Sequence, residues 1–178
     1  HGFKRLGQLN VEQRVVCDFA PEVFSFFSWP SQAEADAFAA EPAWPAIKAT
    51  RPDAWSELKV YSLELQADLN LSFKAGKRFA ALVAWLKNDE AMTEYSRYLA
   101  GIEPAVERSG GRFIYKMRLP SMEAHATDPA PPHQITFVEW ESDDGFTKVQ
   151  KSAEYRANQK YFGTSMKRFE LYWLKTPG

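Results

Sequence analysis

The sequence contains a single cysteine, Cys17, among its 178 residues. One thiol excludes a disulfide within the chain and excludes a metal site built from cysteines. It also fits a reducing compartment, so we expect a cytoplasmic protein. No apolar run approaches the roughly twenty residues that a membrane-spanning helix needs. The longest candidate, residues 79–86, has the length of a strand, and we therefore expect no membrane partner.

The chain also lacks an excess of charge of either sign. Its 22 Lys and Arg residues face 23 Asp and Glu residues, which gives a formal net charge of −1. A nucleic-acid-binding chain normally carries a basic surplus, so we expect no nucleic acid as partner. The histidines His125 and His133 have no clustered carboxylates around them in the sequence, which makes a poor metal signature. We expect no metal and no cofactor, and haem bound through a histidine stays as an alternative.

An internal repeat is the most informative feature that is present. Residues 24–31, with the sequence FSFFSWPS, return in kind as ITFVEWES at 135–142, an offset of 111 positions. At the same offset Tyr61 falls on Tyr172 and Leu63 falls on Leu174. Few aligned pairs are identical, but apolar and aromatic positions coincide throughout. With 45% hydrophobic residues in the chain, we expect a folded protein made of two copies of one supersecondary unit.

The second copy can be read as a complete series of elements. Periodicity and turn residues predict four strands and two helices in the order β-α-β-β-α-β, the split βαβ arrangement of ferredoxin-like domains. Asp89 and Ser142 are the expected helix N-caps, and the first helix should end at Gly110. The expected strands are 78–87, 112–119, 134–141 and 168–175, and the expected helices are 90–109 and 143–151, with a further turn or two within 152–159.

The first copy contains only part of this series. Residues 24–29 and 57–65 read as strands, 31–40 as a helix, and 2–19 as a strand leading into a hairpin. Shifting Arg78 back by 111 positions reaches 33 positions before His1, so we expect about that many further residues upstream in the parent protein. A natural half-domain with exposed strand edges is the alternative. The predicted division is an incomplete unit over 1–66, a linker over 67–77 and a complete unit over 78–178.

Several short motifs of the second copy, in this order, resemble the bacterial domain-of-unknown-function 1330 family. They are EYSRY at 94–98, SGGRF at 109–113 and SAEYR at 152–156, where Ala153 replaces the usual proline. The first copy resembles the family more loosely, with Trp44 in place of a tyrosine. The resemblance implies an α+β, ferredoxin-like fold whose antiparallel sheets pair into a dimeric α/β-barrel, either within this chain or between chains of a homo-oligomer. It brings no established activity, cofactor or catalytic residue.

Three residues are candidates for catalysis. Glu139 shares a strand face with Phe137, and a desolvated carboxylate there could act as a general base. Alternatively it reaches solvent or pairs with Lys116 or Arg118. His133, at the entrance to the same strand, could move a proton. Tyr115, with Phe113 and Met117 expected on its face and Ile114 on the other, could orient a substrate.

Four further residues are candidates for substrate binding. Arg118 could hold an anionic group, and an aromatic cavity between the sheets could be lined by Tyr61, Tyr172 and Trp140. The alternative is that these aromatic residues belong to the core with their polar atoms satisfied.

We therefore expect a protein that binds a small organic molecule. Catalysis would be cofactor-independent proton transfer or oxygenation. The contrasting hypothesis is a non-catalytic binding or assembly module. An enclosed pocket that touches Glu139 and Tyr115 would favour the first reading, and a solidly packed interface between sheets would favour the second.

Overall fold

The computed structural model describes residues 1–125 and 130–178, and it has a mixed α+β fold with antiparallel strands. Six strands form one sheet in the order β2-β1-β8-β4-β7-β5, and β3 and β6 form a second, two-stranded sheet. The strands of the larger sheet are β1 (Lys4–Val16), β2 (Val23–Ser28), β4 (Arg78–Leu86), β5 (Gly111–Arg118), β7 (Gln134–Trp140) and β8 (Met166–Lys175). Those of the smaller sheet are β3 (Leu58–Ser62) and β6 (Ser121–His125).

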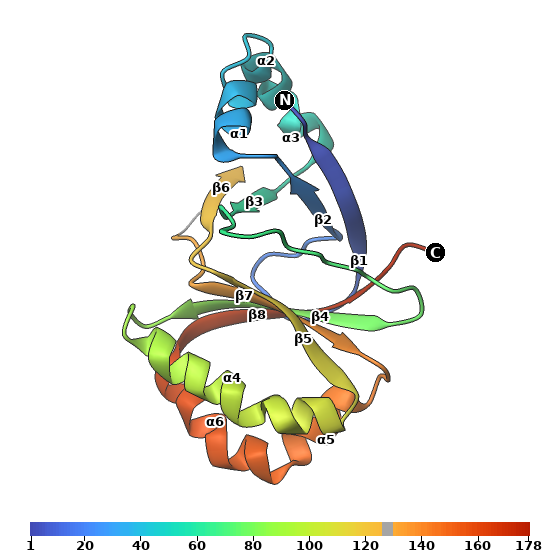
Figure 1. Ribbon diagram of the computed structural model, residues 1–178, viewed down its shortest axis with the longest axis vertical. Helices are drawn as coiled ribbons and strands as arrows, with labels where there is room; N and C mark the ends of the chain where they lie inside the picture. Colours follow the sequence, from blue (N-terminus) through green and yellow to red (C-terminus); the bar gives the residue numbers. More distant parts are fainter. Residues whose placement is uncertain (126–129) are drawn as a thin grey trace.

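The helices lie at the two ends of the molecule (Figure 1). One group covers a face of the large sheet, which we call the helix face, and consists of α4 (Ala91–Arg108), α5 (Gly145–Lys151) and α6 (Ala153–Ser165). The other group lies beyond β2 and β3 and consists of α1 (Gln32–Ala39), α2 (Trp44–Ala49) and α3 (Arg51–Ala54). Among the described helices none is long and apolar enough to cross a membrane.

The second half of the chain follows the predicted order of elements. Its strands lie in the order β8-β4-β7-β5 with α4 and α5–α6 as crossovers, which is the split βαβ arrangement. The apolar run of β4 forms the centre of the sheet because it is buried on both faces. Tyr95, Leu99, Ile102 and Val106 form the buried stripe of α4. Gly110 ends that helix with a φ of 76°, a conformation that glycine adopts without strain.

Several local predictions were wrong. The N-cap of α4 is Glu90, and the Asn88 side chain accepts the Ala91 N–H, whereas Asp89 was expected. Asp144 takes the place expected for Ser142 at α5. The last helix, α6, begins after the cap Ser152 but continues to Ser165, well beyond the expected turns. The loop expected around 128–132 lies partly outside the described residues.

Strand β6 was not predicted. The chain leaves β5 at Leu119, which has a φ of 49°, and continues through Pro120, which has no N–H for a ladder. This break redirects the chain so that residues 121–125 pair with β3 instead of continuing along β7.

The core consists of two layers on opposite faces of the large sheet. The helix-face cluster packs β4, β7 and β8 against α4 to α6. The opposite face, which we call the inner face, carries a second cluster centred on Leu9, Phe79, Phe137, Tyr172 and Leu174. Partly buried residues from β2, β3 and the 63–77 segment pack against it, including Phe24, Phe26, Tyr61 and Phe73. Both faces of β4, β7 and β8 are therefore covered, as the two-sided apolar pattern of these strands indicated.

Strand β1 joins the two halves of the chain. Its first part pairs with β2, where Leu9 lies opposite Phe24, and its second part pairs with β8, where Arg14 lies opposite Tyr172. The reciprocal link is made by β6 of the second half and β3 of the first, where Met122 lies opposite Tyr61. Each half thus supplies a strand that pairs with the last strand of the other half.

The strand pairs β1–β2 and β5–β7 each contain a β-bulge, at corresponding places. In the first, the register shifts between Arg5 and Gly7, opposite Phe27 and Phe26. In the second, it shifts between Phe113 and Tyr115, opposite Val138 and Phe137, which follow Phe27 and Phe26 by 111 positions. On the bulged strands β1 and β5 the residues on either side of the shift are 108 positions apart, Arg5 with Phe113 and Gly7 with Tyr115.

The integration of β1 can be tested at Leu9, which is fully buried in the inner-face cluster. Leu9→Ala should lower the free energy of unfolding by about 2–5 kcal/mol, because it leaves a cavity between the halves. Leu6→Ala, on the same strand but 57% exposed, is the matched control and should change it by less than about 0.5 kcal/mol. Urea denaturation measures both. Equal, small effects would mean that β1 does not contribute to the core.

Candidate functional site

Glu139 lies on the inner face with Ile135 and Phe137, as the alternation of β7 predicted. It is 6% exposed, and Arg112 Nη2 donates to its Oε1 at 3.2 Å. Among the described residues nothing donates a hydrogen bond to its buried Oε2. Its cationic partner comes from the facing position of β5 and is neither Lys116 nor Arg118.

Tyr115 also belongs to the inner face, but its predicted companions were partly wrong. The β-bulge turns Phe113 to the helix-face cluster and leaves Ile114 on the inner face with Tyr115 and Met117. Burial raises the pKa of the Tyr115 hydroxyl. Phenyl rings fill the neighbouring inner face, where centroids lie 5.5 Å apart for Phe26 and Phe137, and 5.4 Å apart for Phe73 and Phe79. This part of the interface is packed with side chains.

The structure does not bring the three predicted catalytic residues together. His133 lies at the other end of β7 from Glu139, six residues away along the strand, which is roughly 20 Å. Its Nδ1 accepts the Leu86 N–H at 3.1 Å, and its Nε2 lies 3.7 Å from Asp89 Oδ1. Its backbone accepts from Leu119 and donates to Ala84. His133 therefore joins the ends of three strands.

The predicted substrate-binding residues are also divided. Arg118 is exposed at the end of β5, opposite Gln134 and away from Glu139. Trp140 lies in the helix-face cluster, with its ring near those of Phe146 and Trp173. It is therefore separated by the sheet from the inner face. Tyr61 and Tyr172, in contrast, both belong to the inner-face cluster.

A buried polar network at Tyr172 was not predicted from the sequence. Arg168, Glu170 and Tyr172 occupy alternate positions of β8 and therefore share the inner face. Glu170 is only 1% exposed. Its Oε1 accepts from Arg168 Nη2 at 3.1 Å and from the Phe19 N–H at 3.3 Å. The Tyr172 hydroxyl lies 2.8 Å from its Oε2 and 2.7 Å from the Phe19 carbonyl oxygen.

This network fixes the turn that follows β1. Phe19 contacts both Glu170 and Tyr172 through its backbone, and Asp18 Oδ2 lies 3.5 Å from Arg168 Nε. The Arg168 guanidinium also lies 3.9 Å from the centre of the Trp85 ring, a cation–π contact. Burial, and then the neighbouring Glu170 carboxylate, raise the pKa of the Tyr172 hydroxyl, which therefore stays protonated and donates. The sequence did contain a signal for this network. Arg168 and Glu170 are charged residues at alternate positions of a strand that was predicted to be buried.

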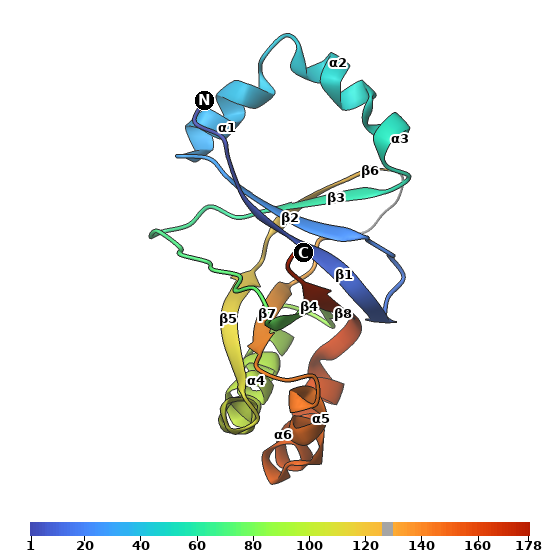
Figure 2. The ribbon, with the colours of Figure 1, turned by 90° about the vertical axis from the view of Figure 1, so that its right-hand side faces the viewer.

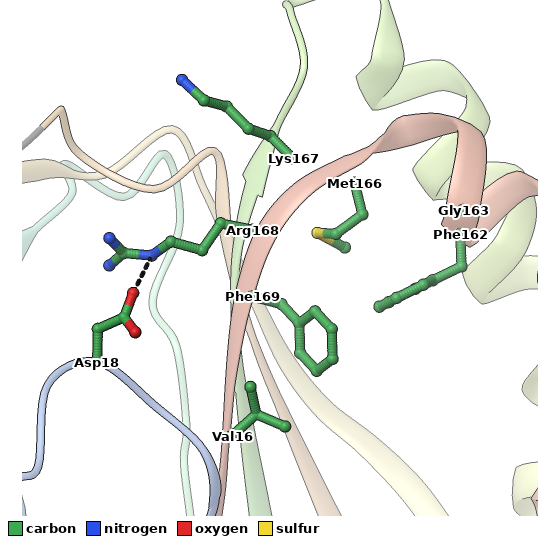
Figure 3. Close-up of a pocket in the computed structure, with 8 residues that line it drawn as sticks. All are labelled: Val16, Asp18, Phe162, Gly163, Met166, Lys167, Arg168 and Phe169. Atoms are coloured by element: carbon green, nitrogen blue, oxygen red, sulfur yellow. Dashed lines mark ion pairs between the residues drawn. The ribbon is translucent and has the colours of Figure 1, made fainter.

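A pocket of about 380 Å³ lies at the same stretch of β8, and Asp18, Lys167 and Arg168 are among the residues that line it. Its side-chain walls include Val16 from β1, Phe162 from α6, and Met166 and Phe169 from β8. Figure 3 shows these four gathered on one side of the strand, with the Arg168–Asp18 ion pair on the other side and Lys167 pointing away. The pocket lies where the first half of the chain meets the second. It touches neither Glu139 nor Tyr115.

In the described part of the chain no three His, Cys, Asp or Glu side chains lie close enough to hold a metal ion. Cys17 is a free thiol close to Tyr172.

Comparison with known proteins gives only distant structural neighbours. No family model matches the chain, and no curated protein matches it. A protein of unknown function from Rhodopseudomonas palustris superposes with a TM-score of 0.49 at 18% identity, over 59% of this chain and 85% of its own.

Two further solved structures are similar. One is a DABB-family protein with a ferredoxin-like fold from Mesorhizobium loti, with a TM-score of 0.42 at 14% identity, over 57% of this chain and 98% of its own. The other is a dimeric ferredoxin-like protein of unknown function from Thermobifida fusca, with a TM-score of 0.40 at 12% identity, over 60% of this chain and 97% of its own. Likenesses this distant say nothing about activity.

The Tyr172 network predicts a loss of stability at alkaline pH. The folded chain holds the hydroxyl proton above pH 10, near which an unfolded tyrosine releases it. The contribution is therefore intact below about pH 10, and above it the free energy of unfolding falls by at most about 1.4 kcal/mol per pH unit for each such tyrosine. Tyr172→Phe should make this fall less steep between about pH 10 and 11.5, as measured by urea denaturation at each pH. An unchanged slope would contradict the role of this hydroxyl.

Proposed function

We propose that this protein binds a small organic molecule in the pocket at the start of β8. One observation carries the proposal: the walls of the pocket come from both halves of the chain, with Val16 facing Phe162, Met166 and Phe169. Ligand sites occur preferentially at such junctions, and about 380 Å³ lies within the usual range for them.

The side chains around the pocket indicate the class of ligand. Two phenyl rings, a thioether and an isopropyl group line one side of the pocket and favour an aromatic or branched apolar body. The charged residues Asp18, Lys167 and Arg168 line it as well. The nearest guanidinium, that of Arg168, is engaged with Asp18, Glu170 and Trp85 across the strand. With Asp18 and Lys167 also in the lining, an apolar body that carries a polar group fits this site.

Binding is favoured over proton transfer. Glu139, His133 and Tyr115 are spread along and beside β7, and phenyl rings occupy the inner face next to Glu139 and Tyr115. Glu170 is the most buried carboxylate among the described residues, but its oxygens are already paired and the Phe19 backbone covers it. Tyr172 and Glu170 support a positioning role, in which they fix β8 and the turn after β1 beside the pocket.

We also propose that residues 1–66 and 78–178 are copies of one ferredoxin-like unit, connected by 67–77, that build an α/β-barrel within one chain. The coincident bulges support this. Arg14 pairs with Tyr172 and Met122 pairs with Tyr61; Arg14 and Met122 are 108 positions apart, as the bulged residues of β1 and β5 are, and the two tyrosines are 111 apart. Two backbone hydrogen bonds also correspond at these offsets. The Val11 N–H donates to the Glu22 carbonyl in the first half, and the Leu119 N–H donates to the His133 carbonyl in the second. Membership of the 1330 family and a cytoplasmic location stay predictions from the sequence.

Binding can be tested with indole, cyclohexanol and benzoate as probes in ligand-observed NMR and calorimetric titrations. Val16→Trp should fill the pocket and raise the dissociation constant of an apolar probe at least about tenfold, which corresponds to about 1.4 kcal/mol. Val15→Trp is the matched control, since both valines are 42% exposed but only Val16 lines the pocket. It should change the constant less than about twofold. Equal effects of the two variants, or no saturable binding of any probe, would contradict the proposal.

A further inference from the structure

Exposed apolar side chains are concentrated in the first half of the chain. Of the thirteen large hydrophobic residues that are exposed in the described structure, twelve lie before residue 70 and one, Leu119, lies in the second half. None of the helices α1, α2 and α3 contains a buried residue, whereas α4 buries seven. Single exposed apolar residues are ordinary, but a contiguous group of them marks an interaction surface.

Aromatic rings form a continuous row on this surface. Neighbouring centroids lie 5.2 Å apart for Phe27 and Phe3, 4.9 Å for Phe3 and Trp29, and 4.8 Å for Trp29 and Phe38. Trp44 continues the row at 4.7 Å from Phe38. Phe3 and Phe27 are both half exposed, and Trp29, Phe38 and Trp44 are partly buried. We call these five residues the aromatic row.

In the second half, the corresponding positions are covered. Residues 111 positions after Phe27, Trp29, Phe38 and Trp44 are Val138, Trp140, Val149 and Tyr155. Val138 and Trp140 of β7 and Val149 of α5 are buried in the helix-face cluster, and the Tyr155 ring of α6 packs against Tyr98 of α4. The aromatic row therefore lies at the positions of the first half that correspond to the residues packed against α4 in the second half.

Two strand edges beside the aromatic row are open as well. In the second half β4 lies between β7 and β8 and pairs with both. The strands at the equivalent places of the first half are β2 and β3, and each has one described partner, β1 and β6 respectively. Figure 2 shows β2 and β3 close to each other below the arch of α1 to α3. Each therefore has one edge along which no described strand pairs, and such an edge can accept a further strand.

We propose that this open side of the first half is the docking site of a strand followed by an amphipathic helix. The strand pairs with β2 and β3 at the same time, and the helix lays its apolar stripe on the aromatic row, as β4 and α4 do in the second half. The occupant is a segment with the pattern of residues 78–110, contributed by polypeptide outside residues 1–178. A second copy of the chain cannot supply its own β4–α4, because Phe79, Leu99 and Ile102 are buried in its own core. The inference is independent of the ligand pocket.

The test supplies such a segment. A copy of residues 78–110 is fused ahead of Phe3. The bulges place β1 and β5 at an offset of 108 positions (113 − 5), so Gly111, which follows residues 78–110, corresponds to Phe3. In hydrogen exchange, the edge amides of β2 and β3 should exchange at least about tenfold more slowly than in the unmodified chain, and Tm should rise. A matched fusion with Leu99→Asp and Ile102→Asp in the added copy alone should lose both gains. Unchanged exchange of β2 and β3, with rapid proteolysis of the added segment, would overturn the proposal.

The oligomeric state of the unmodified chain is the second arm. Light scattering after size-exclusion chromatography should give the mass of a monomer for the chain and for the variants Phe27→Glu and Leu119→Glu, both at exposed positions. A dimer that Phe27→Glu dissociates and Leu119→Glu leaves intact would show that a second copy occupies the aromatic row. That result would overturn the assignment of the surface to a strand–helix segment.

Discussion

The antiparallel pairing of β1 with β8 is the interaction on which the rest of the structure depends. Each residue of a strand carries a donor and an acceptor that must be paired when buried. The first part of β1 satisfies these groups with β2, and the second part satisfies them with β8. One strand of 13 residues therefore extends the sheet of the second half and pairs with β2 of the first half. The inner-face cluster then fills the space that this shared strand encloses.

Both features of the candidate site follow from where β1 ends. Val16 is its last residue and forms one wall of the pocket, while Asp18 and Phe19, just beyond it, contact Arg168, Glu170 and Tyr172. Burying a carboxylate is unfavourable unless it is hydrogen-bonded. The Phe19 N–H therefore stabilises the buried Glu170 carboxylate, and the same hydrogen bond fixes the turn after β1. This junction therefore combines a pocket with apolar and charged walls and a buried polar network.

Much of the fold could be predicted from the sequence because its signals are local. The apolar run of β4, the stripe of α4 and the glycine at its end each lie within a short window. Predictions were wrong where a local pattern is overruled by distant partners. The bulge at Ile114 reverses the face of Phe113, and the break at Leu119 and Pro120 sends β6 to β3. The candidate site was misplaced for the same reason: Glu170 matters because Phe19, 151 residues away, covers it.

Native-state hydrogen exchange in increasing urea tests the central claim most directly, since it measures the opening free energy of each backbone amide. The hydrogen-bonded amides where β1 pairs with β8, around Gln13 and Arg14, are compared with those where β4 pairs with β8, around Leu82 and Ala84. If β1 binds the halves into one cooperative unit, both groups open with the same free energy, equal to that of global unfolding. Opening of the β1 amides at a much lower free energy, while the β4 amides stay protected, would contradict this account.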